Sequence, residues 1–201
     1  MIDLNGAELR DPQGQIRAVQ ALDRELAERI MPKLRHPGVL TTIYSGELKY
    51  TFLPIEQHYQ RYFTIPGCGK TSQNTPFSSF EADYRRLESL AELSEPLFKI
   101  EMRSASLDAL HQIRSQLENI PEIALTSAFT HNLEVLPQTC NKASALKQLQ
   151  KLLDLQREEI AVFGDDLNDL CLFEQFPNSY AVANAKPEIL RRARTVIAAC
   201  E

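Results

Sequence analysis

The chain has 201 residues and a net charge of −5, with 43% hydrophobic and 24% charged residues. This composition is typical of a soluble globular protein, and the length allows one large domain or two small ones. The negative charge argues against nucleic-acid binding, and no stretch reaches the ~20 apolar residues that cross a bilayer. Residues 1–6 lack the basic start and apolar run of a signal peptide, and the four cysteines form no CxxC pair. We therefore expect a cytoplasmic protein without a zinc site.

Helical and strand-like patterns alternate in the first part of the chain. Apolar residues recur every three or four positions from Ile16 to Ile30, which predicts an amphipathic helix ending near Pro32. Strand-like runs at 39–44 and 50–53 flank a short turn, as in a β-hairpin. The stretch at 64–77, rich in Gly, Pro, Ser and Thr, is typical of a long loop.

The same periodicities predict the elements that follow this loop. Ser106 is a suitable N-cap for one of the helices. The expected helices span 79–93 and 107–117, and the expected strands span 98–102, 123–128 and 133–136. Helices mixed with hairpins predict an α+β domain with a largely antiparallel sheet.

From Lys142 onward the pattern becomes a regular alternation of helix and strand. The run at 159–163 is short and apolar, as in a strand that is buried on both faces. Helices are expected at 143–153, 168–173 and 188–196, and strands at 159–163 and 180–183. This order predicts the α/β fold class, as a fragment of a doubly wound parallel sheet.

The strongest chemical signal is the acidic turn Gly164–Asp169, which follows the strand at 159–163. In open α/β sheets ligands bind beyond the carboxyl ends of the strands, so these side chains should project into a site. Carboxylate oxygens in this position suit Mg²⁺, which takes one or two carboxylates and keeps waters or phosphate oxygens. The alternative is a purely structural turn, in which Asp166 caps the next helix and Asp169 favours its N-terminus.

Lys142 is the second candidate, because it opens a helix shortly after the run at 133–136. A lysine there can place its charge against a phosphate group or a carboxylate nucleophile. A solvated surface lysine is the more common explanation for a single lysine. The acidic turn further along the chain makes a combined phosphate and metal site a reasonable hypothesis.

Four segments then carry a family resemblance. In chain order they are Leu4–Ala7, Leu133–Pro137 with Asn141–Ala143, Gly164–Asp169, and Val182–Glu188. Together they resemble the Cof-type branch of the haloacid dehalogenase-like (HAD) phosphatases, over nearly the whole chain. The resemblance implies a Rossmann-like parallel core interrupted by an α+β cap domain. Its expected boundaries are 1–13 for a core edge segment and hinge, 14–132 for the cap, and 133–201 for the rest of the core.

The resemblance also implies an activity and roles for particular residues. It implies Mg²⁺-dependent hydrolysis of small phosphorylated metabolites, such as a sugar phosphate or a cofactor precursor, through an aspartyl-phosphate. By position, Lys142 would organise the phosphate and Asn168 would orient the site. Asp165 would be the direct Mg²⁺ ligand and Asp169 the supporting acid. Asp166 falls at a variable position of the motif and receives no role.

The family's nucleophile motif, DxDGT, is not found in this sequence. Ile2–Ala7 is superficially similar, but only two residues precede Asp3, too few for a buried central strand. Asn5 also replaces the second aspartate, and an amide has no proton to shuttle. We therefore expect an incomplete core with exposed apolar strands and an impaired or inactive enzyme. The alternative is a non-catalytic HAD-like binding or assembly domain, or a truncated remnant, and a homodimer is possible in either case.

The segment Gly67–Thr71 invites a different interpretation, as a nucleotide-binding P-loop. The P-loop motif requires a glycine where this sequence has Thr64, and the segment has no clear strand before it or helix after it. We favour a loop in which Lys70 could reach the substrate, with a mobile surface loop as the simpler alternative.

Overall fold

A computed structural model of the chain describes residues 2–11, 13–68 and 75–199. The chain divides into two compact units. The core unit consists of Met1–Val19 and Thr139–Glu201, and the insert unit consists of Gln20–Gln138. In the described residues, no helix is long and apolar enough to cross a membrane. Residues 69–71, and with them most of the segment considered as a P-loop, lie outside the described residues.

The insert unit is built on one six-stranded sheet with the strand order β6-β5-β4-β7-β9-β8. All neighbouring strands are antiparallel except β5 and β6, which are parallel. The strands are β4 (Val39–Ser45), β5 (Leu48–Thr51), β6 (Tyr84–Arg86), β7 (Leu97–Ser104), β8 (Ile123–Thr126) and β9 (Asn132–Pro137). The predicted α+β domain with a largely antiparallel sheet is therefore present.

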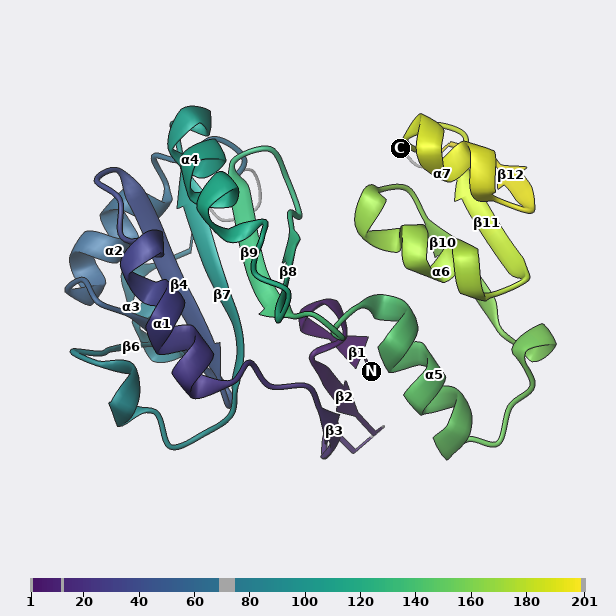
Figure 1. Cartoon of the computed structure of the whole chain (residues 1–201), viewed down its shortest axis with the longest axis horizontal. Helices are drawn as coiled ribbons and strands as arrows, with labels where there is room; N and C mark the ends of the chain where they lie inside the picture. The colour runs from purple at the N-terminus through teal and green to yellow at the C-terminus, as the bar shows by residue number, and fades with distance from the viewer. Residues whose placement is uncertain (1, 12, 69–74, 200–201) are drawn as a thin grey trace. The chain divides into compact units, whose positions relative to one another are not determined.

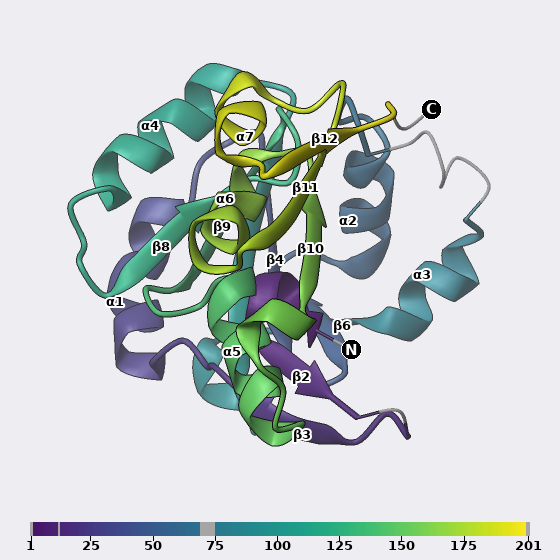
Figure 2. The same cartoon turned by 90° about the vertical axis from the view of Figure 1, so that its right-hand side faces the viewer.

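Helices cover both faces of this sheet, as Figures 1 and 2 show. On one face lie α1 (Arg24–Leu34) and α4 (Leu107–Leu117), which bury an apolar stripe against residues such as Ile43, Ile100 and Val135. On the other lie α2 (Ile55–Tyr62) and α3 (Phe77–Asp83). Burial of the two apolar layers is the main force that holds the unit together.

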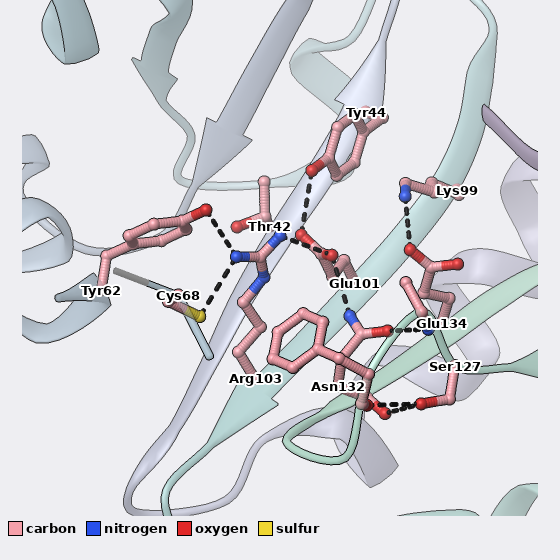
Figure 3. A network of polar contacts seen from close by, with 12 residues as sticks. Thr42, Tyr44, Tyr62, Cys68, Lys99, Glu101, Arg103, Ser127, Asn132 and Glu134 are labelled. Atoms are coloured by element: carbon pink, nitrogen blue, oxygen red, sulfur yellow. Dashed lines mark hydrogen bonds and ion pairs between the residues drawn. The ribbon is translucent and has the colours of Figure 1, made fainter. Parts of the chain in front are cut away.

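The second face of the sheet also carries a buried network of charged and polar residues on β4, β7 and β9 (Figure 3). Glu101 accepts hydrogen bonds from Arg103 at 2.8 Å, Tyr44 at 2.9 Å and Asn132 at 2.8 Å. Lys99 pairs with Glu134 at 2.5 Å. The network therefore balances its charges with groups from neighbouring strands, and it links the strands in one register.

The core unit contains two small three-stranded sheets. β1 (Ile2–Asp3), β2 (Glu8–Arg10) and β3 (Ile16–Val19) form an antiparallel sheet. β10 (Ala161–Gly164), β11 (Asn178–Val182) and β12 (Thr195–Ile197) form a parallel one. The helices are α5 (Lys142–Leu152), α6 (Leu170–Gln175) and α7 (Pro187–Arg192), which share an apolar core with the parallel strands. The predicted fragment of a parallel α/β sheet is confirmed.

Four single turns of 3₁₀-helix complete the secondary structure of the described residues. Two of them, η1 and η4, lie beside the groups considered below, η1 where the N-terminal segment meets α5 and η4 in the acidic turn. The four are η1 (Leu4–Gly6), η2 (Leu90–Glu92), η3 (Arg157–Glu159) and η4 (Leu167–Asp169).

The predicted helix from residue 16 to Pro32 is only half correct. Residues 16–19 form β3, because they pair with β2. The helix α1 begins after Asp23, whose carboxylate accepts the Leu26 N–H at 2.8 Å, and it continues two residues beyond Pro32. A capping aspartate thus set the helix start that the apolar spacing alone placed too early.

Three further elements differ from the prediction. The single helix expected at 79–93 is α3, then the strand β6, then the 3₁₀ turn η2. Residues 55–62, for which no element was predicted, form α2. The helix expected at 188–196 ends at Arg192, and Thr195–Ile197 adds a third parallel strand. In the first and third cases strand pairing overrode a local helical pattern.

The division between the units lies at different residues from those expected. It falls after Val19 rather than after residue 13, and after Gln138 rather than after residue 132. The reason is strand pairing: β3 pairs with β2 in the core unit, whereas β9 pairs with β7 and β8 in the insert unit. The strand before Lys142 is consequently antiparallel and is not a strand of the parallel core.

Candidate active site

The candidate site lies at the carboxyl end of β10, where the strand ends at Gly164. The acidic turn follows, and its second half forms η4. A Cβ atom on Gly164 would lie 2.6 Å from Asp169 Cβ and 2.7 Å from Asp169 Cγ, which is closer than real Cβ contacts allow. Glycine is therefore required here so that the side chain of Asp169 can fold back against the strand end.

Asp169 is the buried centre of this turn, with 5% of its surface exposed. One carboxylate oxygen, Oδ2, accepts the backbone N–H of Asp165 at 3.1 Å and that of Asp166 at 3.4 Å. The other, Oδ1, forms an ion pair with the ammonium group of Lys142. Burial of a carboxylate requires such partners, and Asp169 in turn fixes the backbone of the residues that carry the neighbouring carboxylates.

Lys142 reaches Asp169 because it is the first residue of α5. Asn141 caps this helix: its side chain accepts the Ser144 N–H at 2.9 Å, and the Ser144 hydroxyl accepts the Asn141 N–H at 3.1 Å. The side chain of Lys142 is 33% exposed, against 6% for that of Asp169. The Lys142 side chain is therefore held by the buried carboxylate and still keeps a third of its surface accessible to solvent.

The N-terminal segment packs closely on the start of α5. A Cβ atom on Gly6, whose φ is +100°, would lie 2.4 Å from the carbonyl oxygen of Asn141. The thiol of Cys140 also points at the carbonyl oxygen of Asn5, at 3.8 Å. Glycine is thus needed at position 6 both for its left-handed φ and for this close approach, which ties the segment to the residue that precedes Lys142.

A second ion pair closes the other side of the turn. Lys186 Nζ lies 2.6 Å from Asp166 Oδ1, and the Lys186 N–H donates to the carbonyl oxygen of Asp165 at 2.9 Å. Burial alone would raise the pKa of Asp166. This pKa is nevertheless held below its ordinary value by hydrogen bonds from Lys186 and the Leu167 N–H, and by the charges of Lys186 and Lys142. Asp166 is therefore a carboxylate at neutral pH.

The structure brings together all four residues proposed from the sequence. Asp165 has an exposed side chain at the strand end, and Asn168 lies half-buried in η4. Asp165 is joined to Asp169 by the hydrogen bond described above, and Asp169 to Lys142 by the ion pair. Sequence reasoning gave no role to Asp166 and did not single out Lys186, although the segment Val182–Glu188 that contains Lys186 was part of the family resemblance.

The donor set fits a partial site for Mg²⁺. Within the described ranges, no group of three or more His, Cys, Asp or Glu residues is arranged to hold a metal ion. Mg²⁺ needs fewer, because it is commonly held by one or two carboxylates with waters or phosphate oxygens in its other positions. Exposed Asp165 is available as such a ligand, whereas Asp169 is already engaged by Lys142 and two backbone N–H groups.

Apolar side chains of the parallel sheet are exposed on both of its faces, with Phe163 and Ile197 on one face and Val196 on the other. Phe163 on β10 is 60% exposed and stacks on Tyr180 of β11 with ring centroids 5.1 Å apart. Val196 and Ile197 on β12 are 50% and 36% exposed. In the described part of the chain β10 pairs with β11 alone, so its other edge has no strand partner there.

Comparison with known proteins agrees with this architecture. A sequence profile of haloacid dehalogenase-like hydrolases matches residues 1–200. The chain is 25% identical to the phosphatase YwpJ of Bacillus subtilis, over 94% of this chain and 70% of YwpJ. It is 30% identical to YwtE of B. subtilis, a 5-amino-6-(5-phospho-D-ribitylamino)uracil phosphatase, over 55% of this chain and 38% of YwtE.

A solved structure shares the fold. The structure of a haloacid dehalogenase-like hydrolase from B. subtilis superimposes with a TM-score of 0.75 over 96% of this chain and 72% of that one, at 24% identity. The chain thus covers part of the length of each of these proteins. With the profile match over residues 1–200, the chain belongs to the haloacid dehalogenase-like hydrolase family, as its Cof-type motifs predict.

Proposed function

We propose that the strand-end site of the core unit is the phosphate- and Mg²⁺-binding part of a HAD-type phosphatase. The observation that carries the proposal is the convergence of Lys142, Asp165 and Asp169 at the carboxyl end of β10. A cation and carboxylates that share one backbone-anchored turn provide what a phosphate group and its metal ion need.

Each residue has a distinct task in this proposal. Lys142 offsets the charge of the phosphate group with its exposed side while Asp169 holds its position. Asp165 is the ligand for Mg²⁺, which would supply charge neutralisation at the phosphate oxygens when bound. Asn168 orients the site by hydrogen bonding. Asp166 and Lys186 keep the turn in shape.

We further propose that the chain by itself is an impaired or inactive enzyme. Asp3 is the only aspartate in the segment that superficially resembles the nucleophile motif, and Asn5 stands where the second aspartate is required. Asp3 also lies on β1, which pairs antiparallel with β2 in a sheet separate from that of β10. Without a nucleophile the covalent route is closed, and enzymes that lose theirs typically lose several orders of magnitude in rate.

The proposed substrates are small phosphorylated metabolites, and the insert unit is the proposed cap. The printed activity of YwtE, on a phosphorylated ribitylaminouracil, supports this substrate class.

Binding of inorganic phosphate with and without Mg²⁺ tests the proposal, because it does not require turnover. We expect phosphate to shift the amide resonances of Asp165 and Asp169, and Mg²⁺ to strengthen this binding. Asp165→Ala should abolish the Mg²⁺ effect and Lys142→Gln should weaken phosphate binding itself. Phosphate that leaves these amides unchanged at any Mg²⁺ concentration would contradict the assignment.

A second candidate is a non-catalytic HAD-like assembly domain. The face of the parallel sheet that carries exposed Phe163 and Ile197 favours it, since exposed apolar surfaces mark interaction sites, and a homodimer is the simplest assembly. Sedimentation equilibrium distinguishes the two. If the face is an interface, Phe163→Ser should convert a dimer to a monomer, whereas Leu153→Ser, on a residue that is 57% exposed but outside the sheet, should not.

A further inference from the structure

The insert unit contains a cavity of about 540 Å³ that lies wholly within that unit. It is formed where the end of α1, the start of β4 and the end of β5 meet α2 and the segment that follows β6. A neighbouring cavity of about 230 Å³ shares Arg35, Phe52 and Glu88 with it. The volume of the larger cavity is in the range of sites that hold small molecules.

Three basic side chains line the cavity: Arg35, His36 and Arg61. Arg35 and His36 follow α1 directly, whereas Arg61 belongs to the last turn of α2. Among the described residues neither arginine forms an ion pair. Arg61 has a 3.5 Å hydrogen bond to the carbonyl oxygen of Val39, which uses one of its five N–H donors.

The nearby negative charge does not neutralise these groups. Glu88 is the acidic residue of the lining, and its carboxylate lies 2.7 Å from the guanidinium of Arg86. Arg35 and Arg61 both lie at helix C-termini, which attract cations, but the two helices are different and bring both guanidinium groups to one cavity. Two guanidinium groups on one concave surface present paired N–H donors that match the oxygens of a phosphate or carboxylate.

Most of the remaining lining is apolar, and Thr41 and Thr51 are its uncharged polar residues. Val39 and Leu87 are buried, and the half-buried ring of Phe52 lies 5.4 Å from the guanidinium carbon of Arg35. His36 donates from Nδ1 to the carbonyl oxygen of Pro37 at 2.6 Å, which fixes the orientation of its ring. A ligand that matches this surface has an anionic end for the arginines and an apolar body for the walls.

We propose that this cavity binds a small organic oxyanion, a phosphate ester or a carboxylate with an apolar body, independently of the strand-end site of the core unit. The site would give the insert unit a ligand of its own. It uses residues from Arg35 to Glu88, none of which takes part in the proposed phosphatase chemistry.

Amide chemical-shift mapping with three probes tests the proposal on the whole chain, in EDTA so that no divalent cation contributes. Phenyl phosphate and benzoate carry the two oxyanions on the same ring, and benzyl alcohol carries no charge. We expect phenyl phosphate to shift Gly38, Val39 and Leu87. Comparison of benzoate with phenyl phosphate tells which oxyanion the cavity prefers. If benzoate binds as tightly as phenyl phosphate, the cavity selects by charge; if benzoate binds more weakly, it is a phosphate site.

Matched variants locate the binding. Arg61→Gln and Arg35→Gln should each weaken the binding of phenyl phosphate by about tenfold, which corresponds to a loss of ~1.4 kcal/mol of binding free energy. Arg29→Gln is the control on α1, because the Arg29 side chain is 61% exposed and points to Glu122. Lys142→Gln should leave this binding unchanged, whether or not the core unit binds phosphate. Unaltered cavity amides, equal binding of benzyl alcohol, or full affinity in Arg61→Gln with an unchanged melting temperature would each overturn the proposal.

Discussion

The two units each hold a cluster of ion pairs, and the clusters differ in how much of them is enclosed. In the insert unit, Glu101 is 2% exposed and receives three hydrogen bonds from its own sheet. In the core unit, Asp169 is buried in a similar way, but its partner Lys142 is 33% exposed. The basic partners in the first cluster are nearly buried, with the side chains of Lys99 and Arg103 9% and 13% exposed, whereas the basic partner in the second is one-third exposed. Burial alone therefore does not mark a functional charge; an open partner does.

The enclosed cluster should give the largest effect on stability. Arg103→Met removes the main partner of Glu101 and leaves a buried charge without compensation, which typically costs ~3–5 kcal/mol. Burial by itself would raise the pKa of Glu101. The charges of Arg103 and Lys99, together with hydrogen bonds from Arg103 and Tyr44, outweigh burial and hold that pKa below its ordinary value. Urea denaturation at neutral pH measures the loss.

The double variant Glu101→Gln/Arg103→Met is the control for this prediction. It removes the unpaired charge, so a large part of the stability should return. If the double variant were as unstable as Arg103→Met, loss of packing rather than the stranded carboxylate would be responsible.

A smaller loss is expected at the open cluster from Gly164→Ala. The added Cβ would overlap Asp169 and displace its carboxylate from Lys142, and overpacking of this kind typically costs ~1–3 kcal/mol. Phosphate binding should be lost along with part of the stability. The φ of Gly164 is not positive, so the loss would come from the clash; Gly14→Ala, where φ is +83° and a Cβ meets nothing within 4 Å, measures backbone strain alone for comparison.

Asp169→Asn should separate binding from stability. The amide keeps the size of the side chain and one acceptor oxygen, but it loses the charge that holds Lys142. We expect a loss of ~1–2 kcal/mol in unfolding free energy, toward the lower end of the range for hydrogen bonds to charged groups because the amide keeps one acceptor, together with loss of Mg²⁺-dependent phosphate binding. Retained binding in a folded Asp169→Asn protein would show that the carboxylate does not position Lys142.

The smallest effect concerns pH and the exposed pair of Asp166 and Lys186. Because the pKa of Asp166 is lowered in the folded state, its contribution is present above the unfolded pKa of about 3.9 and is lost as pH falls through the lower folded value. Solvent screening keeps the contribution below ~1 kcal/mol. In Lys186→Gln, carbon NMR of the Asp166 carboxyl group should find its pKa raised toward the ordinary value; an unchanged pKa would exclude the ion pair as a cause.

The same comparison indicates which features the sequence could reveal. The acidic turn and Lys142 were predictable because they follow recognisable motifs and strand ends. Ser106 likewise predicted the start of α4 correctly, since a cap is a local signal. The Glu101–Arg103 network and the cavity beside Arg61 were not predictable, because they depend on strand register and on α2, an element with no clear sequence pattern. The membership of β9 in the antiparallel sheet of the insert unit was also not predicted, since periodicity does not distinguish parallel from antiparallel strands.

A crystal structure of the chain grown with Mn²⁺, as a visible substitute for Mg²⁺, and tungstate, as a substitute for phosphate, tests the central claim most directly. We expect Mn²⁺ coordinated by Asp165 and tungstate in contact with the ammonium group of Lys142, with the Asp169 carboxylate still accepting the N–H groups of Asp165 and Asp166. Mn²⁺ and tungstate bound only at other places, with the carboxyl end of β10 empty, would contradict the account.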